Sequence, residues 1–121
     1  MLQIPQHLRD GTLVDLNQLL PIVERHLQVD SWMIEVEECI RSVSDGIEFL
    51  EISVSTLKHH ELVILYKDVY QTIDGIFTGF TASKEVVNLI AIGSTCWEIS
   101  SVELTLLDDM TNKFGTYPEN I

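Results

Sequence analysis

The feature that most constrains the fold is a pair of alternating segments joined by turn-forming residues. In WMIEVEECI, residues 32–40, one face would carry Trp32, Ile34, Val36 and Ile40, and the other Met33, Glu35, Glu37 and Cys39, with Glu38 interrupting the first row. A second apolar segment, IEFLEISV at 47–54, follows the turn sequence SVSDG. Alternation with period two indicates half-buried strands. The two segments therefore predict an antiparallel hairpin with one solvated face.

Two other segments have the spacing of amphipathic helices. The first covers residues 15–27, and its apolar stripe is Leu16, Leu19, Leu20, Val23 and Leu27. Pro21 interrupts this stripe, so the helix either kinks there or begins near Leu20. The second runs from a capping box of Ser100 and Glu103 to a C-terminal cap at Gly115. Its predicted buried stripe is Val102, Leu106, Leu107, Met110 and Phe114.

Residues 56–73 fit two patterns. A helical stripe of Leu62, Leu65, Tyr66, Val69 and Ile73 favours a helix, whereas the Asp74-Gly75 pair favours two strands joined by a hairpin turn. We predict the helix because it matches over the longer window. Further strands are expected at 75–80, 86–92 and 97–99. The chain thus predicts a single α+β domain over residues 1–121, a mostly antiparallel sheet packed with amphipathic helices that include a C-terminal helix.

The charge of the chain excludes several function classes. Nineteen acidic and seven basic residues among 121 give a formal charge of −12. Binding to nucleic acid or to anionic membranes requires clusters of Lys and Arg, so neither is expected. The N-terminal residues do not resemble a signal peptide, and no apolar run reaches the roughly 18 residues of a membrane span. With only Cys39 and Cys96, we expect a cytoplasmic protein with two buried free thiols.

Candidate catalytic and metal-binding residues are few. GSTCWEIS, residues 93–100, resembles the nucleophile segment of papain-like proteases, but no histidine follows Cys96 to act as its base. His59 and His60 are adjacent and therefore poorly placed to share a metal ion. Glu35 and Glu37 would lie roughly 7 Å apart on one strand face, which is more typical of a solvated surface than of an acid–base pair. The sequence therefore predicts no catalytic residue, metal ligand or cofactor.

The distribution of the acidic residues points to a protein partner instead. Seven acids fall in the predicted hairpin: Asp30, Glu35, Glu37, Glu38, Asp45, Glu48 and Glu51. Only Arg41 opposes them there. A negative face of this kind would steer a basic partner by a salt-sensitive attraction. The predicted partner-binding residues are Glu35, Glu37, Glu38, Glu48 and Glu51.

The chain from about residue 70 to Phe114, roughly a third of its length, resembles a known group of proteins. The order of IDGIFTG at 73–79, LIAIGSTCWEIS at 89–100 and an acidic helix ending at Phe114 is similar to that of small immunity proteins of bacterial polymorphic-toxin systems. The resemblance implies a non-catalytic protein that neutralises a toxin domain, for which a basic nuclease would be the natural target.

The leading interpretation is thus an immunity or inhibitor protein that masks a basic partner. One alternative is a small enzyme or ligand-binding domain with a pocket between sheet and helices lined by Trp97, Cys96, Tyr66 and Tyr70. Another is a homo-oligomer that pairs through an exposed strand edge.

Overall fold

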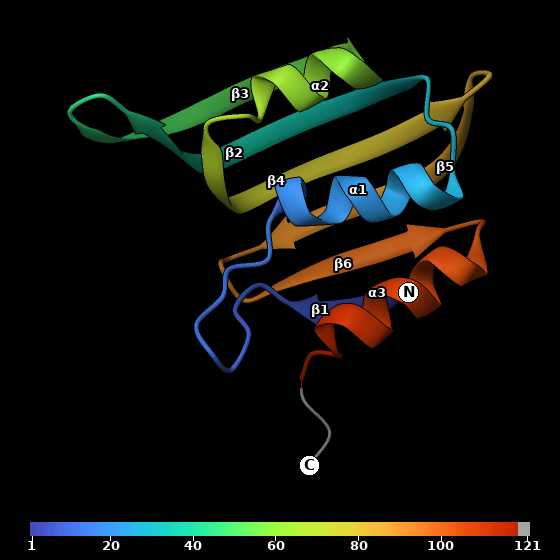
Figure 1. The fold of residues 1–121 in the computed structure, drawn as a ribbon. Coiled ribbons are helices and arrows are strands. Elements are labelled where there is room, and N and C mark those ends of the chain that lie inside the picture. The colour runs from blue at the N-terminus through green and yellow to red at the C-terminus, as the bar shows by residue number, and fades with distance from the viewer. Residues whose placement is uncertain (119–121) are drawn as a thin grey trace.

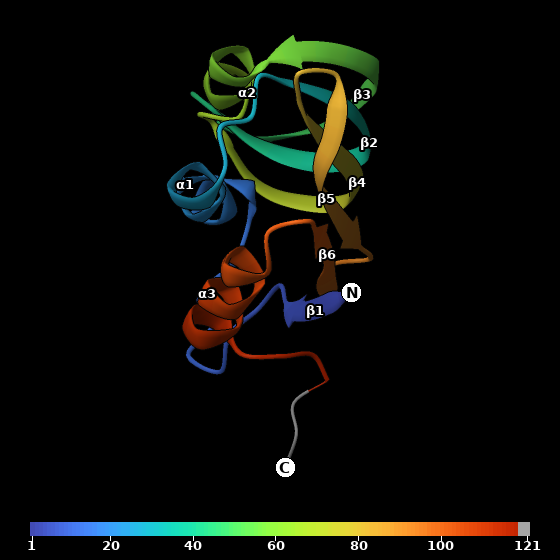
Figure 2. The same ribbon diagram turned by 90° about the vertical axis from the view of Figure 1, so that its right-hand side faces the viewer.

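A computed structural model of the chain describes residues 1–118. Six antiparallel strands form one sheet in the order β1-β6-β5-β4-β2-β3, and three helices lie on one of its faces (Figures 1 and 2). The strands are β1 Leu2–Pro5, β2 Ser31–Val43, β3 Gly46–Lys58, β4 Val69–Thr81, β5 Lys84–Ile92 and β6 Cys96–Ser101. The helices are α1 Leu16–His26, α2 His59–Leu65 and α3 Leu104–Phe114. This arrangement confirms the predicted α+β class.

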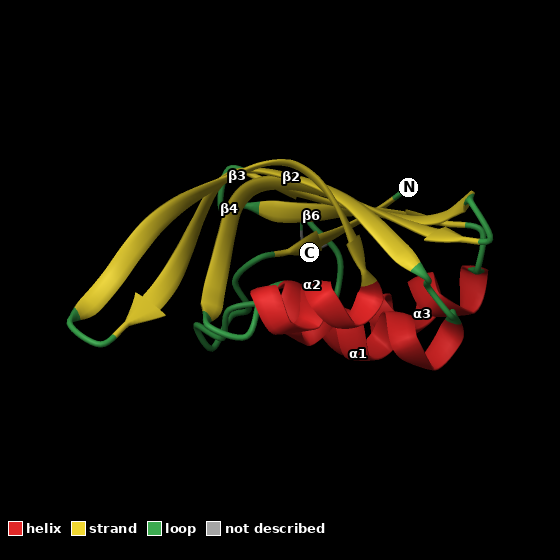
Figure 3. Ribbon diagram, turned by 90° about the horizontal axis from the view of Figure 1, so that it is seen from above, coloured by secondary structure: helices red, strands yellow, loops and turns green. Residues whose placement is uncertain are grey.

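The predicted hairpin is formed by β2 and β3, and the sheet arches over the helices (Figure 3). The pairing of β2 with β3 runs from Ser31↔Lys58 to Val43↔Gly46, and β4 pairs along the other side of β2. Both ladders of β2 are interrupted by register shifts. Because each extra residue bends a strand and increases its twist, the bulges account for the curvature of this part of the sheet.

One bulge corrects the predicted faces of β2. Val36 and Cys39 are both fully buried, although they are three residues apart, and the intervening Glu37 and Glu38 are exposed. The register shifts between Val36 and Cys39 against both neighbouring strands. The prediction that Cys39 lies on the solvated face is therefore wrong. The bulge adds one residue after Val36, so that Cys39, and not Glu38, is the next side chain to point into the core.

The first helix runs through Pro21. It begins at Leu16, next to the start of the predicted segment 15–27, so the alternative of a start near Leu20 is wrong. The side chain of Gln18 accepts a hydrogen bond of 2.8 Å from the Asp15 N–H, which closes the first turn. Pro21 and Asn17 are both exposed, so water can reach the Asn17 carbonyl that the missing proline N–H leaves free. The apolar stripe faces the core as predicted.

The helix predicted over residues 56–73 is mostly wrong. Only His59–Leu65 is helical, whereas residues 56–58 end β3 and residues 69–73 begin β4. The alternative turn at Asp74-Gly75 is also wrong, because both residues lie inside β4. A Cβ atom on Gly75 would stand 3.2 Å from Thr72 Cγ2 and 3.4 Å from the Glu35 carbonyl oxygen. The glycine therefore serves a close approach between strands, not a turn.

The C-terminal helix forms, but its predicted capping box does not. Strand β6 continues to Ser101, whose hydroxyl accepts from the Glu103 N–H at 3.1 Å, and the helix begins at Leu104. Val102 precedes the helix and is exposed, so its assignment to the buried stripe is wrong. Leu106, Met110 and Phe114 are buried, as predicted. Gly115 ends the helix as predicted, with a positive φ of +79° that favours glycine, but its ψ of −167° lies outside the left-handed helical region expected for this cap.

The space between the sheet and the helices is filled by side chains. Tyr66 packs edge-on against Phe77 at 5.4 Å between ring centroids, and Phe77 packs against Trp97 at 6.0 Å. The indole N–H of Trp97 donates to the Val14 carbonyl at 2.9 Å. The tyrosine and the tryptophan are thus part of the core instead of lining a pocket. Of the three helices within residues 1–118, none has the length and apolar character needed to cross a bilayer.

Candidate functional site

The sheet face that carries no helix is the main candidate site, and we call it the open face. Its strands turn alternate side chains outward, because the intervening residues are buried against the helices. Outward residues of β2, β3, β4 and β5 therefore lie side by side. Those that border surface hollows are Met33, Glu35, Glu37, Glu51, Val54, Asp74, Ile76, Thr78, Ile90 and Ile92.

Three shallow hollows on the open face meet at Glu35. The largest, about 550 Å³, lies between β2 and β3 and is bordered by Glu35, Glu37, Glu51 and Val54. The second, about 240 Å³, extends from Glu35 and Glu37 across Asp74 and Ile76 to β5. The third, also about 240 Å³, is bordered mainly by Met33, Val54 and Ile76. Carboxylates and aliphatic side chains thus alternate around one centre.

The structure brings together three of the five predicted partner-binding residues. Glu35, Glu37 and Glu51 border the same hollow, and none of them forms an ion pair within residues 1–118. Glu38 follows Glu37 in the bulge and is exposed. Glu48 lies elsewhere. It forms an ion pair of 2.6 Å with Arg41, and it points to the same face of β3 as Leu50 and Ile52, which pack toward the core. Glu35, Glu37 and Glu51 therefore place three carboxylates without a cationic partner within residues 1–118 around one hollow of the open face.

Exposed apolar side chains on the same face were not predicted as site residues. Met33 is 44% exposed, Ile76 44% and Val54 62%. The alternation of β2 already placed Met33 on the solvated face, which was the available signal. Val54 could not be placed from sequence, because the shift between Ile34↔Ser55 and Val36↔Ile52 sets its orientation. Apolar side chains ringed by charge are typical of protein-binding surfaces.

The two cysteines and His59, which were considered for catalysis or metal binding, are buried or held by contacts within the fold. Cys96 and Cys39 are buried free thiols, which confirms the expectation from the cysteine count, although the alternation of residues 32–40 had placed Cys39 outward. His59 accepts from the Trp32 indole N–H at 3.0 Å through Nδ1 and contacts Glu24 at 3.1 Å through Nε2. Among residues 1–118, no three His, Cys, Asp or Glu side chains gather in a way that could hold a metal ion.

Comparison with known proteins gives no relative for the chain. No family model, curated protein or solved structure matches it. Function is therefore argued from the surface itself.

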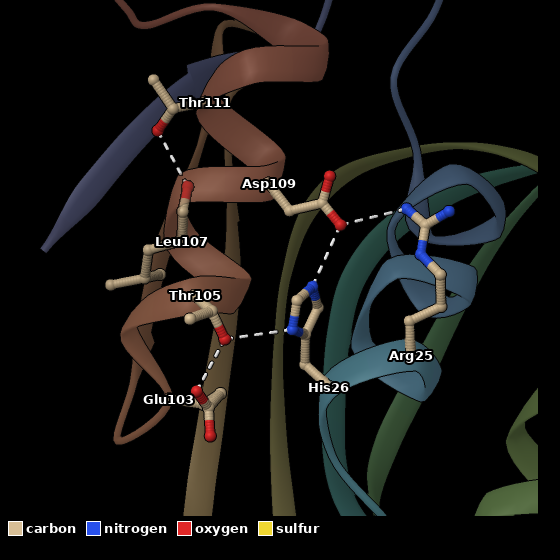
Figure 4. A network of polar contacts seen from close by, with 7 residues as sticks. All are labelled: Arg25, His26, Glu103, Thr105, Leu107, Asp109 and Thr111. Atoms are coloured by element: carbon tan, nitrogen blue, oxygen red, sulfur yellow. Dashed lines mark hydrogen bonds and ion pairs between the residues drawn. The ribbon is translucent and has the colours of Figure 1, made fainter.

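A hydroxyl, an imidazole and a carboxylate stand in series between α1 and α3 (Figure 4). Thr105 Oγ1 lies 3.1 Å from His26 Nδ1, and His26 Nε2 lies 3.0 Å from Asp109 Oδ2. This is the order of groups in serine hydrolases, but the Thr105 hydroxyl donates its hydrogen to Glu103 at 2.6 Å. The hydroxyl hydrogen is thus directed at Glu103 and not at the imidazole, which is not the arrangement of a nucleophile with its base. The pKa of Asp109 is lowered, mainly by its hydrogen bond with His26 and further by the charge of Arg25.

One ionisable group is buried away from the open face. Asp15 is 1% exposed and accepts from the Thr72 backbone N–H at 2.6 Å. The Thr72 hydroxyl lies 3.3 Å from its second oxygen and 3.1 Å from the Tyr66 hydroxyl. Burial raises the pKa of Asp15 to about 6, although the hydrogen bonds from Thr72 oppose the shift. This group joins α1 to β4 and has no access to a ligand.

Proposed function

We propose that the protein is a non-catalytic inhibitor, most simply an immunity protein, whose open face covers a basic functional site on a partner protein. The observation that carries the proposal is the position of Glu35, Glu37 and Glu51. These carboxylates have no cationic partner within residues 1–118 and border one hollow, which meets at Glu35 a second hollow bordered mainly by Met33, Val54 and Ile76. A surface with this composition fits a partner that supplies both positive charge and apolar contact.

The two kinds of side chain have separate roles in this proposal. Unpaired carboxylates accelerate the encounter with a positively charged partner, and the attraction weakens as salt screens it. Burial of apolar surface contributes roughly 25 cal/mol per Å² and holds the complex once it has formed. A partner that neutralises the carboxylates on contact also avoids leaving them buried and unpaired, which would be strongly destabilising.

The immunity role is supported by the order of features in the second half of the chain. The segment resembling immunity proteins corresponds to β4, β5, β6 and α3, in the order strand, strand, turn, strand and helix. The net charge of −12 suits a target whose own site binds phosphate. A nuclease toxin domain is such a target, because an acidic surface can occupy a site built for nucleic acid.

The proposal is tested with three tagged baits incubated in extracts of the cells that make the protein. The baits are the wild type, the variant Glu35→Lys/Glu37→Lys/Glu51→Lys, and a control, Glu85→Lys/Asp108→Lys/Glu61→Gln, altered at exposed acids elsewhere. We expect a basic protein retained at low salt by the wild type and the control, and released at high salt. The open-face variant should fail to retain it while keeping the wild-type circular dichroism spectrum.

The purified partner then tests inhibition directly. Its activity, including nuclease activity, should fall to the baseline at one equivalent of wild type or control protein. Equal retention and equal inhibition by the folded open-face variant would refute the proposed site. A retained protein whose activity is unchanged at saturation would refute the inhibitor role and leave only binding.

A further inference from the structure

The two edges of the sheet differ in how they are protected. Edge strand β1 has only four residues, ends at Pro5, and its Gln3 carbonyl accepts the Tyr117 N–H at 2.8 Å. Edge strand β3 has thirteen residues and pairs only with β2. Within residues 1–118, no hydrogen bond joins the free side of Gly46–Ile52 to another element. In an antiparallel strand, every second residue of this edge directs its N–H and C=O outward.

The accessible part of this edge is its first half. Figure 1 shows the tip of the β2–β3 hairpin extending beyond the three helices, while α2 lies over the other half of β3. A register shift lies between Ile52 and Ser55, and the Ser55 hydroxyl donates to the Ser53 carbonyl at 2.8 Å. The bulge therefore ends the regular edge at Ile52, and Gly46–Ile52 remains as a continuous segment of strand in which Gly46, at the hairpin turn, has a positive φ of +139°.

The side chains along this segment define what could pair with it. Ile47, Phe49 and Glu51 point to the open face, since Leu50 and Ile52 pack against the core from the other side. Ile47 is 55% exposed and Phe49 60%. An added strand would place apolar side chains beside Ile47 and Phe49 and a basic one beside Glu51. Its opposite face would bring a basic side chain to Glu48.

Charge distinguishes between two occupants of the edge. A second copy of the chain would bring Asp45, Glu48 and Glu51 to the same seam twice, and each copy carries a net charge of −12. Such pairing brings like charges together, whereas a basic segment neutralises Glu51 and adds to the positive charge that Arg41 already brings to Glu48.

We propose that Gly46–Ile52 is a docking edge for an extended segment of the basic partner, which adds to the sheet as a seventh strand beside β3. The inference rests on the proposed function and specifies how the partner is engaged. Backbone hydrogen bonds would hold the segment, and apolar side chains beside Ile47 and Phe49 with basic ones beside Glu51 and Glu48 would give specificity. The docked strand would continue the open face directly next to Glu51.

The test uses a synthetic peptide, acetyl-VKTVKVT-amide, whose lysines fall opposite Glu51 and Glu48 in antiparallel pairing with Gly46–Ile52. Titration into ¹⁵N-labelled full-length protein should shift the amide signals of residues 46–52 and slow their hydrogen exchange. Two control peptides carry N-methyl groups on alternate residues, in either phase. One phase should weaken binding at least about tenfold, because it blocks the side of the peptide that donates to the edge.

Protein variants separate the edge from general charge. Glu48→Lys/Glu51→Lys should weaken binding of the peptide about tenfold at low salt, and Glu85→Lys/Asp108→Lys should change it little. Shifts confined to residues around Glu35 and Asp74, with 46–52 unchanged, would overturn the edge and leave the open-face proposal intact. Absence of binding at millimolar peptide would overturn the inference. Shifts of 46–52 that grow with protein concentration alone would assign the edge to a second copy.

Discussion

Asp15 shows how one residue can carry opposing effects. Its carboxylate accepts the Thr72 N–H and so ties the start of α1 to β4. The same burial that makes this contact strong makes the charged form costly, and the pKa of Asp15 rises to about 6. Its folded-state pKa therefore lies above the unfolded value near 3.8. The folded chain holds a proton there between these two pH values.

We predict that the fold becomes less stable as the pH rises through that interval, because the folded chain then loses this proton. The difference between pKa values of 3.8 and about 6 corresponds to roughly 3 kcal/mol of unfolding free energy, which is present below pH 4 and lost by about pH 7. In Asp15→Asn the amide oxygen can still accept from Thr72, and this dependence should vanish. Urea unfolding at pH 4 and pH 7.5 measures the effect as the difference between variant and wild type.

Asp10 provides the matched control for this measurement. It is exposed, and hydrogen bonds from Thr12 lower the pKa of its carboxyl. Asp10→Asn should therefore show no gain over the wild type on going from pH 4 to pH 7.5. A free-energy difference for Asp15→Asn that is the same at both pH values would show that Asp15 does not retain a proton in the folded state.

Among the secondary structure elements, those with a local signature were predictable and those set by pairing were not. The hairpin of β2 and β3 is indicated by the alternation of apolar and polar residues on both sides of SVSDG, and α3 is indicated by the helical spacing of its apolar residues. Strand β4 does not, because residues 69–73 follow a helical spacing until pairing with β2 makes them extended. Strand β1 has only Leu2 and Ile4 to face the core and depends on β6 for its existence.

The same limit applies to the candidate site. The acids of β2 could be found from composition, but whether each belongs to the open face depends on bulges. The separation of Glu48 from Glu51 needs no bulge, because the two residues are three positions apart in a regular strand and alternation alone puts them on opposite faces; only Glu51 reaches the hollow beside Glu35. The exposure of both Glu37 and Glu38, by contrast, depends on the bulge of β2. A bulge is a property of two paired strands, and neither sequence alone contains it.

Helices α1 and α3 are joined by the network around Asp109, and this contact has its own prediction. Asp109→Asn should lower the melting temperature by a few degrees at pH 6 and low salt, and by less in 1 M salt, because exposed ion pairs are screened. The pKa of Asp109 is lowered, so its contribution is present above the unfolded value and disappears as the pH falls below it.

The neighbouring Asp108 is the control for this network. It is exposed on the same helix, and within residues 1–118 it takes part in no ion pair. Asp108→Asn should therefore leave the melting temperature unchanged at both salt concentrations. If the two variants melted alike, the contact between α1 and α3 would have no measurable role in stability.

At the scale of the whole molecule, the fold separates stability from interaction. All three helices cover one face of the sheet, so the core lies between them and the opposite face is left to solvent (Figure 2). Substitutions on the open face therefore do not open cavities in the core. Glu37 and Glu51 are fourteen residues apart in the sequence, and they border one hollow only because β2 pairs with β3.

This separation predicts distinct kinetic effects for the two kinds of open-face residue. Against the partner isolated with the wild-type bait, Glu35→Lys/Glu37→Lys should reduce the association rate at least about tenfold and flatten its salt dependence, with less change in dissociation. Met33→Ser and Ile76→Ser should instead speed dissociation about tenfold and leave association within about twofold, because short-range apolar contacts act after the encounter. Stopped-flow and surface plasmon resonance at several salt concentrations measure both rates.

The control is Val63→Ser/Ile64→Ser, which alters exposed apolar residues of α2 on the helix side and should change neither rate. Apolar variants that slowed association as much as the charge variants would mean that docking on the open face is not steered by its carboxylates.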